Sequence, residues 1–191
     1  PDAPTGVNAV AGNGSATVSF TAPTVTGGPA IASYTVTASP NGATCTVNAP
    51  ATSCVVPGLT NGTAYTFAVT ANNGLFTSSA STASSSVVPA TVPGAPTSVT
   101  ATSNASGTAT ISFTAPANGG SAITSYQYST DGGSTWKNRA TGTTASPVVI
   151  TTVSSSTASL VNGTSYTVAL RAVSNVGNSV ASSTVSATPM T

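Results

Sequence analysis

Charge is almost absent from this chain of 191 residues, which contains no Glu and no His. Only five side chains carry a formal charge: Asp2, Asp131, Lys137, Arg139 and Arg171. General acid–base catalysis needs a titratable group at the substrate, and a nucleophilic Ser or Thr needs a base beside it. Two isolated carboxylates form no catalytic pair or triad, so we expect that the chain is not an enzyme and needs no cofactor.

The same shortage excludes several classes of ligand. Hard cations need several carboxylates, and zinc or copper needs imidazoles or clustered thiolates, whereas the chain has only two cysteines. Three cations form no basic patch for a phosphate backbone. No apolar run approaches the roughly 20 residues that cross a bilayer. We therefore expect no bound metal, no nucleic acid partner and no membrane insertion.

The most informative feature that is present is an internal repeat. The segment Ala16–Pro23 (ATVSFTAP) returns as Ala109–Pro116 (ATISFTAP), and Asn61–Ala71 returns as Asn162–Ala172. Repetition in the same order at domain-length spacing indicates two copies of one folding unit. We predict domains at residues 1–89 and 90–191. Two prolines in the linker, residues 89–93, favour a stiff and extended connection.

Alternation of apolar and polar residues predicts strands in both copies, and no helical period is present. A Ser-, Thr- and Gly-rich chain can also be disordered, but 39% hydrophobic content and the alternation favour a folded one. Seven short strands in each copy describe an antiparallel sandwich. They are predicted at residues 7–10, 16–20, 31–38, 45–47, 54–56, 65–69 and 84–88, and at 98–102, 109–114, 123–129, 135–138, part of 147–160, 165–173 and 180–187. The second copy has nine extra residues in or near 151–159.

Both copies resemble fibronectin type III domains, in the version common in secreted and surface proteins of bacteria. Leu59–Tyr65 (LTNGTAY) and Leu160–Tyr166 (LVNGTSY) look like the tyrosine corner of that family. The resemblance implies two tandem immunoglobulin-like β-sandwiches, with the hydroxyls of Tyr65 and Tyr166 bonded to upstream backbone. It also implies an extracellular or surface location.

One departure from the family and one internal similarity accompany this resemblance. Phe20 and Phe113 stand where the family usually has a core Trp. The opening Pro1–Pro4 is similar to Pro93–Pro96 before the second copy. We interpret the chain as part of a longer array.

The two cysteines, Cys45 and Cys54, occur only in the first copy. In a surface-type module such a pair predicts a disulfide, with free buried thiols as the alternative. A redox switch is disfavoured because no cation is close enough to activate a thiolate. Closing so short a loop adds roughly 2–3 kcal/mol of stability. The second copy has no such link and is expected to rely on packing alone.

Residues 129–136 (STDGGSTW) fit the spacing of the Asp-box, a β-hairpin turn found in sialidases. The arginine cluster and the Tyr–Glu pair of a sialidase are missing, so we expect only a structural hairpin. Trp136, Lys137 and Arg139 are the one place where an aromatic residue and two cations gather, and they form a candidate site for a sugar ring or a protein surface. The alternative is that Trp136 packs on the hairpin and the cations only solubilise it. We expect Arg171 to be solvated.

These observations lead to two hypotheses about function. The first is a non-catalytic spacer or scaffold in a stalk, filament or array, whose partners are neighbouring modules or identical subunits. The alternative is an adhesion or binding module for a glycan or a protein, possibly accessory to a polysaccharide-degrading enzyme. Its contacts would come from loops 24–30 and 118–122 or from the Trp136 hairpin.

Overall fold

The computed structural model describes residues 1–140 and 143–191. The described residues form strands, turns and irregular segments and contain no helix, which confirms the predicted all-β fold. Contacts within the chain divide it into two compact units, residues 1–91 and 92–191, here called module 1 and module 2. The sequence pattern places this boundary slightly earlier, between residues 89 and 90.

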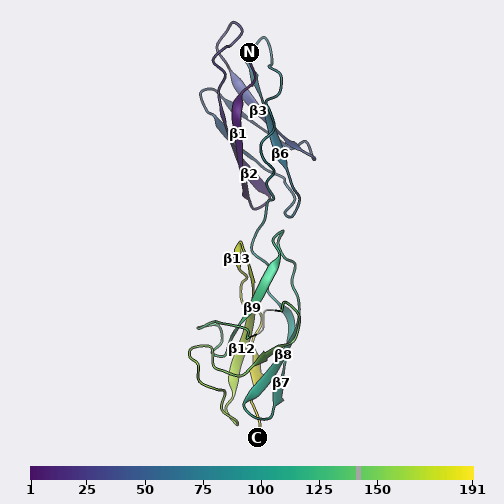
Figure 1. Cartoon of the computed structure of the whole chain (residues 1–191), viewed down its shortest axis with the longest axis vertical. Coiled ribbons are helices and arrows are strands. Elements are labelled where there is room, and N and C mark those ends of the chain that lie inside the picture. Colours follow the sequence, from purple (N-terminus) through teal and green to yellow (C-terminus); the bar gives the residue numbers. More distant parts are fainter. Residues whose placement is uncertain (141–142) are drawn as a thin grey trace. The chain divides into compact units, whose positions relative to one another are not determined.

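Module 1 consists of two antiparallel sheets of three strands each (Figure 1). One sheet has the strand order β1-β2-β5 and the other has the order β4-β3-β6. The strands are β1 (Thr5–Gly12), β2 (Ser15–Thr21), β3 (Ser33–Ser39), β4 (Thr44–Asn48), β5 (Ser53–Val56) and β6 (Thr66–Asn72).

Module 2 repeats this plan with shorter edge strands (Figure 1). One sheet has the order β11-β8-β7, and the other has the order β10-β9-β12-β13, with β14 also paired to β12. The strands are β7 (Thr97–Asn104), β8 (Thr108–Thr114), β9 (Ile123–Ser129), β10 (Lys137–Asn138), β11 (Val148–Ile150), β12 (Tyr166–Ser174), β13 (Gly177–Asn178) and β14 (Val185–Ala187).

Alternate residues of equivalent strands build the two cores. The residues that alternation assigns to the buried face are the buried ones: Ala16, Val18 and Phe20 in β2, and Ala109, Ile111 and Phe113 in β8. The ring of Phe20 packs on Tyr34 with centroids 4.9 Å apart, and Phe113 packs on Tyr126 at 4.6 Å, both in a tilted geometry. Phe at this position therefore fills the core of each module with the same aromatic pair.

The last segment of module 1 runs beside β6 without forming a regular strand. The predicted strand at 84–88 is wrong apart from one bridge between Tyr65 and Val87. Three serines at a spacing of three residues bond instead to alternate residues of β6: Ser78 to Ala71, Ser81 to Val69 and Ser84 to Phe67. We call this arrangement the serine ladder.

Each serine of the ladder makes three hydrogen bonds. The N–H of Ser84 donates to the Phe67 carbonyl at 2.9 Å, and its Oγ accepts from the Phe67 N–H at 3.1 Å. The same hydroxyl donates to the Ser85 carbonyl at 2.8 Å. Successive ladder serines are three residues apart, whereas their partners in β6 are two residues apart. Each repeat of the ladder therefore contains one residue more than regular pairing, as a β-bulge does. The ladder satisfies the β6 edge while offering no regular edge for another strand.

Module 2 contains the same device in a shorter form. Ser179 and Ser182 bond in the same way to Ala172 and Leu170 of β12. Regular pairing resumes only at β14, so the strand predicted at 180–187 is correct only for its part at 185–187. In both modules, serine hydroxyl oxygens replace backbone carbonyls as the acceptors for strand N–H groups.

Replacing Ser182 with Ala is expected to weaken the ladder of module 2. The Leu170 N–H is bonded to the Ser182 Oγ at 3.0 Å, and Leu170 is fully buried. Leaving a buried N–H without an acceptor costs about 1–3 kcal/mol. Amide hydrogen exchange at Leu170 should therefore become faster. Ser183→Ala is the matched control, because Ser183 is exposed and contributes only its carbonyl. Equal exchange in the two variants would contradict the role given to the hydroxyl.

Candidate functional site

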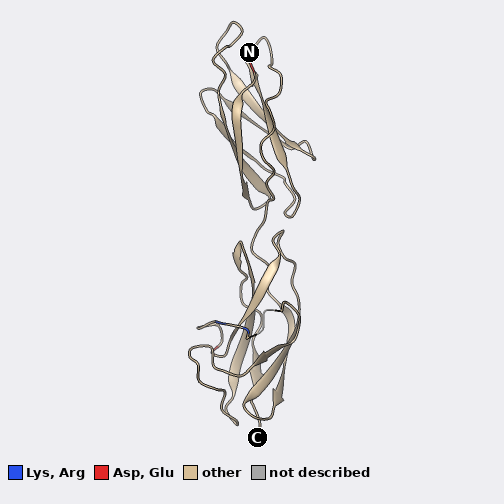
Figure 2. Cartoon of the chain, viewed as in Figure 1, with Lys and Arg blue, Asp and Glu red and all other residues tan. Residues whose placement is uncertain are grey.

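Four of the five charged residues lie in module 2 (Figure 2). The predicted site residues Trp136, Lys137 and Arg139 lie on β10 and its ends, beside β9. The hairpin that connects the two strands is the Asp-box turn. This hairpin determines where the three side chains point.

Asp131 is held by its own hairpin. Its carboxylate accepts hydrogen bonds from the Ser129 hydroxyl at 2.6 Å, the Thr135 hydroxyl at 2.6 Å and the Thr135 N–H at 2.9 Å. These bonds, with Ser129 the largest contributor, lower the pKa of Asp131 from 3.8 to about 2. Gly132 and Gly133 adopt positive φ in the same turn. Asp131 therefore holds the turn together through three bonds to its charged form.

Trp136 contacts Arg171 on the outer face of the sheet. The guanidinium carbon of Arg171 lies 4.4 Å from the centre of the Trp136 ring, a cation–π contact. Arg171 Nε also donates to Gln127 Oε1 at 2.6 Å. Gln127 in turn donates to Asn138 Oδ1 at 2.8 Å. Arg171 was expected to be solvated, and it instead covers the tryptophan; its partner lies far away in the sequence, so spacing gave no signal for it.

Lys137 and Arg139 point away from Trp136. Lys137 is paired with the buried Tyr128, so its side chain leaves the strand on the core side. Its Nζ donates to Thr152 Oγ1 at 2.9 Å and to the Ser156 carbonyl at 2.7 Å. Arg139 donates to the Ala145 and Pro147 carbonyls at 2.7 and 3.0 Å. The structure therefore divides the predicted trio, with Trp136 on one face and both cations bonded to residues 145–156.

In module 1 the equivalent place is occupied by the disulfide between Cys45 and Cys54, whose Cα atoms are 6.2 Å apart. Cys45 lies on β4 and pairs with Val36 of β3, whereas Cys54 lies on β5 and pairs with Val18 of β2. The disulfide therefore connects the two sheets. Lys137 occupies the place of Cys45, because its partner Tyr128 corresponds to Val36.

The two modules therefore close the same side of the sandwich in different ways. Module 1 uses a covalent link, and module 2 uses hydrogen bonds from Lys137 and Arg139 to residues 145–156. The expectation that module 2 relies on packing alone is corrected by these bonds. Burial lowers the pKa of the Arg139 guanidinium, and the carbonyl bonds offset part of the cost of removing it from water.

Each module also contains a buried or half-buried tyrosine whose hydroxyl bonds to backbone upstream. The hydroxyl of Tyr65 accepts from the Thr60 N–H at 3.1 Å, and that of Tyr166 accepts from the Val161 N–H at 2.9 Å. In both cases the acceptor lies five residues after the donor. This is the geometry of a tyrosine corner.

A family model, described as the fibronectin type III domain, matches residues 2–87 and again residues 94–188. The chain belongs to the fibronectin type III family. None of the curated proteins matches it. Among solved structures, the chain is similar to the crystal structure of chicken CNTN1 FN1-FN3 domains, with 18% identity and a TM-score of 0.49. That match covers 100% of this chain and 67% of the other. Family membership and fold together do not specify a ligand.

The described residues of these fibronectin modules contain neither a cluster of metal ligands nor a helix of membrane-spanning character. Within residues 1–140 and 143–191, no three His, Cys, Asp or Glu side chains lie close enough together to hold a metal ion. The same residues include no helix with the length and apolar character needed to cross a membrane.

One apolar turn of the first fibronectin module was missed at the sequence level. Leu75 and Phe76 are 70% and 63% exposed in the turn that follows β6. The buried Asn73 accepts from the N–H groups of both residues and donates to the Thr26 carbonyl at 2.9 Å. The turn therefore lies against loop 24–30, one of the loops that we predicted as a binding surface. Alternation cannot identify it because both apolar residues are adjacent and outside any strand.

Reduction is expected to destabilise only the first fibronectin module. A link that closes so short a loop contributes about 2–3 kcal/mol. For a domain of this size, each kcal/mol corresponds to a change in thermal midpoint of roughly 4–8 °C. Calorimetry of the full chain with and without reductant should show this loss in one transition. The Cys45→Ser/Cys54→Ser variant should resemble the reduced protein and be insensitive to reductant. Alkylation of two free thiols in native, untreated protein would overturn the assignment.

Acid is expected to destabilise the second fibronectin module through Asp131. Its pKa in the folded state is about 2, below the ordinary 3.8, so the carboxylate stabilises the fold above pH 4. That contribution is lost as the pH falls from about 4 through about 2. Because the side chain is exposed, the effect should be small. Asp131→Asn should remove this part of the acid response in thermal melts. A side-chain pKa near 4, measured by NMR in the folded protein, would contradict the prediction.

Proposed function

We propose that this pair of fibronectin type III modules is a non-catalytic structural spacer in a longer extracellular or surface protein, of the type found in bacterial secreted repeats. Its partners would be neighbouring modules of the same chain or identical subunits. The observation that carries the proposal is the use of polar groups. Serine hydroxyls and asparagine amides in both modules, and all three cations of module 2, are bonded within their own sandwich.

The cations provide the clearest example. Lys137 and Arg139 donate to residues 145–156, and Arg171 covers Trp136 and bonds to Gln127. A protein-binding site concentrates its energy in a few exposed aromatic and Arg side chains. Here those residue types stabilise their own module, which supports a spacer more than a specific receptor.

The disulfide supports the proposed location. Disulfides persist in oxidising environments and are rare in reducing ones. The link between Cys45 and Cys54 connects two sheets of a module with a modest core, where additional stability is valuable. Stalks and filaments outside cells need this kind of durability.

The second candidate is ligand binding on the outer face of module 2. Trp136 and Arg171 place an aromatic ring and a guanidinium together there, flanked by Gln127 and Asn138. Such a surface suits stacking on a sugar ring or on a partner's side chain. Loop 24–30 with the exposed Leu75–Phe76 turn offers a second, uncharged apolar surface in module 1.

The two candidates are separated by measuring affinity for a panel of extracellular proteins and acidic glycans. A spacer should bind none of them with a dissociation constant below about 10 μM, equivalent to roughly 7 kcal/mol. Trp136→Ala and Phe76→Ala serve as matched variants, one on each surface. Tight binding that either variant abolishes would replace the spacer proposal with a binding module and identify which surface is used.

A further inference from the structure

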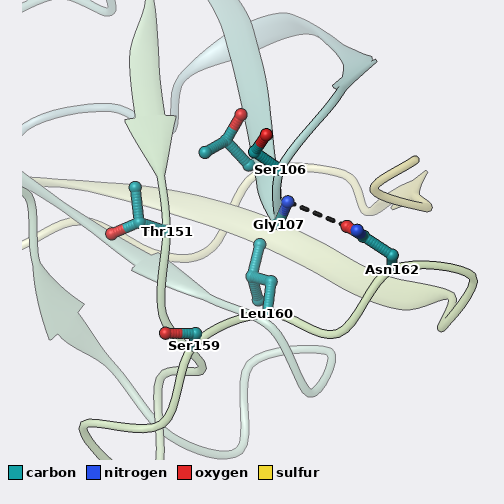
Figure 3. A pocket seen from close by; sticks show the side chains of 7 residues that line it. Ser106, Gly107, Thr151, Ser159, Leu160 and Asn162 are labelled. Atoms are coloured by element: carbon teal, nitrogen blue, oxygen red, sulfur yellow. Dashed lines mark hydrogen bonds between the residues drawn. The ribbon is translucent and has the colours of Figure 1, made fainter. Parts of the chain in front are cut away.

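Module 2 has a polar pocket of about 300 Å³ that lies outside the Trp136 hairpin (Figure 3). It is located where the turn between β7 and β8 meets the segments before and after the insertion that follows β11. The lining residues are Ser106, Gly107, Thr108, Thr151, Ser159, Leu160 and Asn162. Of these seven residues, five have a hydroxyl or amide side chain and none carries a charge.

The insertion replaces one hydrogen bond that joins this turn to the following segment in module 1. There, the Leu59 N–H donates to the Gly14 carbonyl at 2.9 Å. The corresponding Leu160 N–H donates to the Thr151 carbonyl at 3.0 Å instead. Only residues 57–58 lie between β5 and Leu59, whereas residues 151–159 lie between β11 and Leu160. The added residues form a small hairpin closed by a bond from the Val153 N–H to the Ala158 carbonyl.

One side-chain hydrogen bond of module 1 has no counterpart in module 2. In module 1, Asn61 donates from Nδ2 to Asn13 Oδ1 at 2.8 Å, and its Oδ1 accepts from the Gly14 N–H. In module 2, Asn162 Oδ1 accepts from the Gly107 N–H at 2.8 Å in the same way (Figure 3). The position of Asn13 is taken by Ser106. Within the described part of the chain, Asn162 Nδ2 therefore has no partner.

The backbone around Ser106 is held in a conformation that serine rarely adopts. Its φ is +63°, in the left-handed region, where Asn is more common than Ser. At the next position, a Cβ on Gly107 would lie 2.8 Å from the Leu160 carbonyl oxygen, so only glycine fits. Non-glycine residues with positive φ cluster at functional sites, where surrounding structure maintains the strain.

We propose that this pocket binds a neutral sugar unit. The Nδ2 of Asn162 and the hydroxyls of Ser106, Thr151 and Ser159 have no hydrogen-bond partner among the described residues, so all four groups are available to a ligand. A ligand that both donates and accepts, and that carries no charge, matches them. Sugar hydroxyls have these properties.

Other classes of ligand fit less well. A phosphate or carboxylate would find no cation in the lining, and an aromatic ligand would find one apolar side chain, Leu160. Small-molecule sites occupy roughly 300–1,000 Å³, so this pocket suits one ring and not a long chain. A single ring has few atoms, and we expect a dissociation constant of about 1 mM. Repetition of such modules along a stalk would raise the effective affinity for a polysaccharide.

The test uses NMR titration of the full, isotope-labelled chain with D-glucose and N-acetyl-D-glucosamine. Saturable shifts are expected at the Gly107 N–H and the Asn162 side-chain amide, with none at Gly14 and Asn61. D-glucose 6-phosphate should bind no better than D-glucose. The proposal is overturned if neither neutral sugar gives saturable shifts by about 100 mM, if Gly14 and Asn61 respond equally, or if the phosphate binds more tightly.

Two substitutions at one position separate binding from folding. Ser106→Asn restores the residue of module 1, so it should close the pocket onto Asn162 and weaken binding at least tenfold without lowering the thermal midpoint. Ser106→Gly relaxes the same backbone but removes one of the four ligand groups, so it should weaken binding by less than Ser106→Asn does. Ser183→Ala lies outside the pocket lining and is the control, which should bind within about threefold of the unmodified chain. A Ser106→Asn protein that titrates like the original would overturn the proposal. This outcome is independent of the Trp136 surface and of the spacer proposal.

Discussion

The structure depends on hydrogen bonds from uncharged side chains to backbone groups. With only five charged side chains among 191 residues, ion pairs cannot organise the surface. Hydrogen bonds of Ser, Asn and Tyr side chains connect the strands and turns instead, at equivalent positions of both modules. Serine hydroxyls satisfy the edge of the β6 and β12 strands, and Asn61 and Asn162 join turns that are distant in sequence. Hydrogen bonds act over short distances and depend on direction. They therefore fix the geometry of each module and do little to attract other molecules.

Two copies of one design also show which interactions can be exchanged. The Phe–Tyr core pair, the tyrosine corner and the serine ladder occur in both modules. The closure of the side between β4 and β5 differs, because the place of Cys45 is taken by Lys137. A lysine there needs acceptors within reach, and the inserted residues provide Thr152 and Ser156. The insertion thus provides the partners that a disulfide makes unnecessary in module 1.

Much of the fold could be predicted from sequence because a period of two is a local signal. The repeated segments, the alternation in β2 and β8, and the turn residues are all visible within a few positions. Alternation did not predict the serine ladder, because its serines repeat every three residues and their hydrogen-bond partners lie in another strand. Residues 78–84 contain the spacing Ser-x-x-Ser-x-x-Ser, which could have revealed it. The Arg171–Trp136 contact and the inward direction of Lys137 depend on long-range register, which no local pattern contains.

The two modules differ at the junction between the first turn of each module and the segment that contains Asn61 or Asn162. Asn13 and Asn61 close one junction, whereas Ser106 leaves the equivalent junction open beside an inserted hairpin. Asparagine adopts positive φ more readily than serine does, so Ser106 costs the module some stability. In a junction with only a structural role, nothing would offset that loss of stability. A spacer can tolerate that cost because its stability comes from two separate cores. The same tolerance lets one copy retain the structural junction while the other changes it, so a site for a ligand can arise at a turn without disturbing the sandwich.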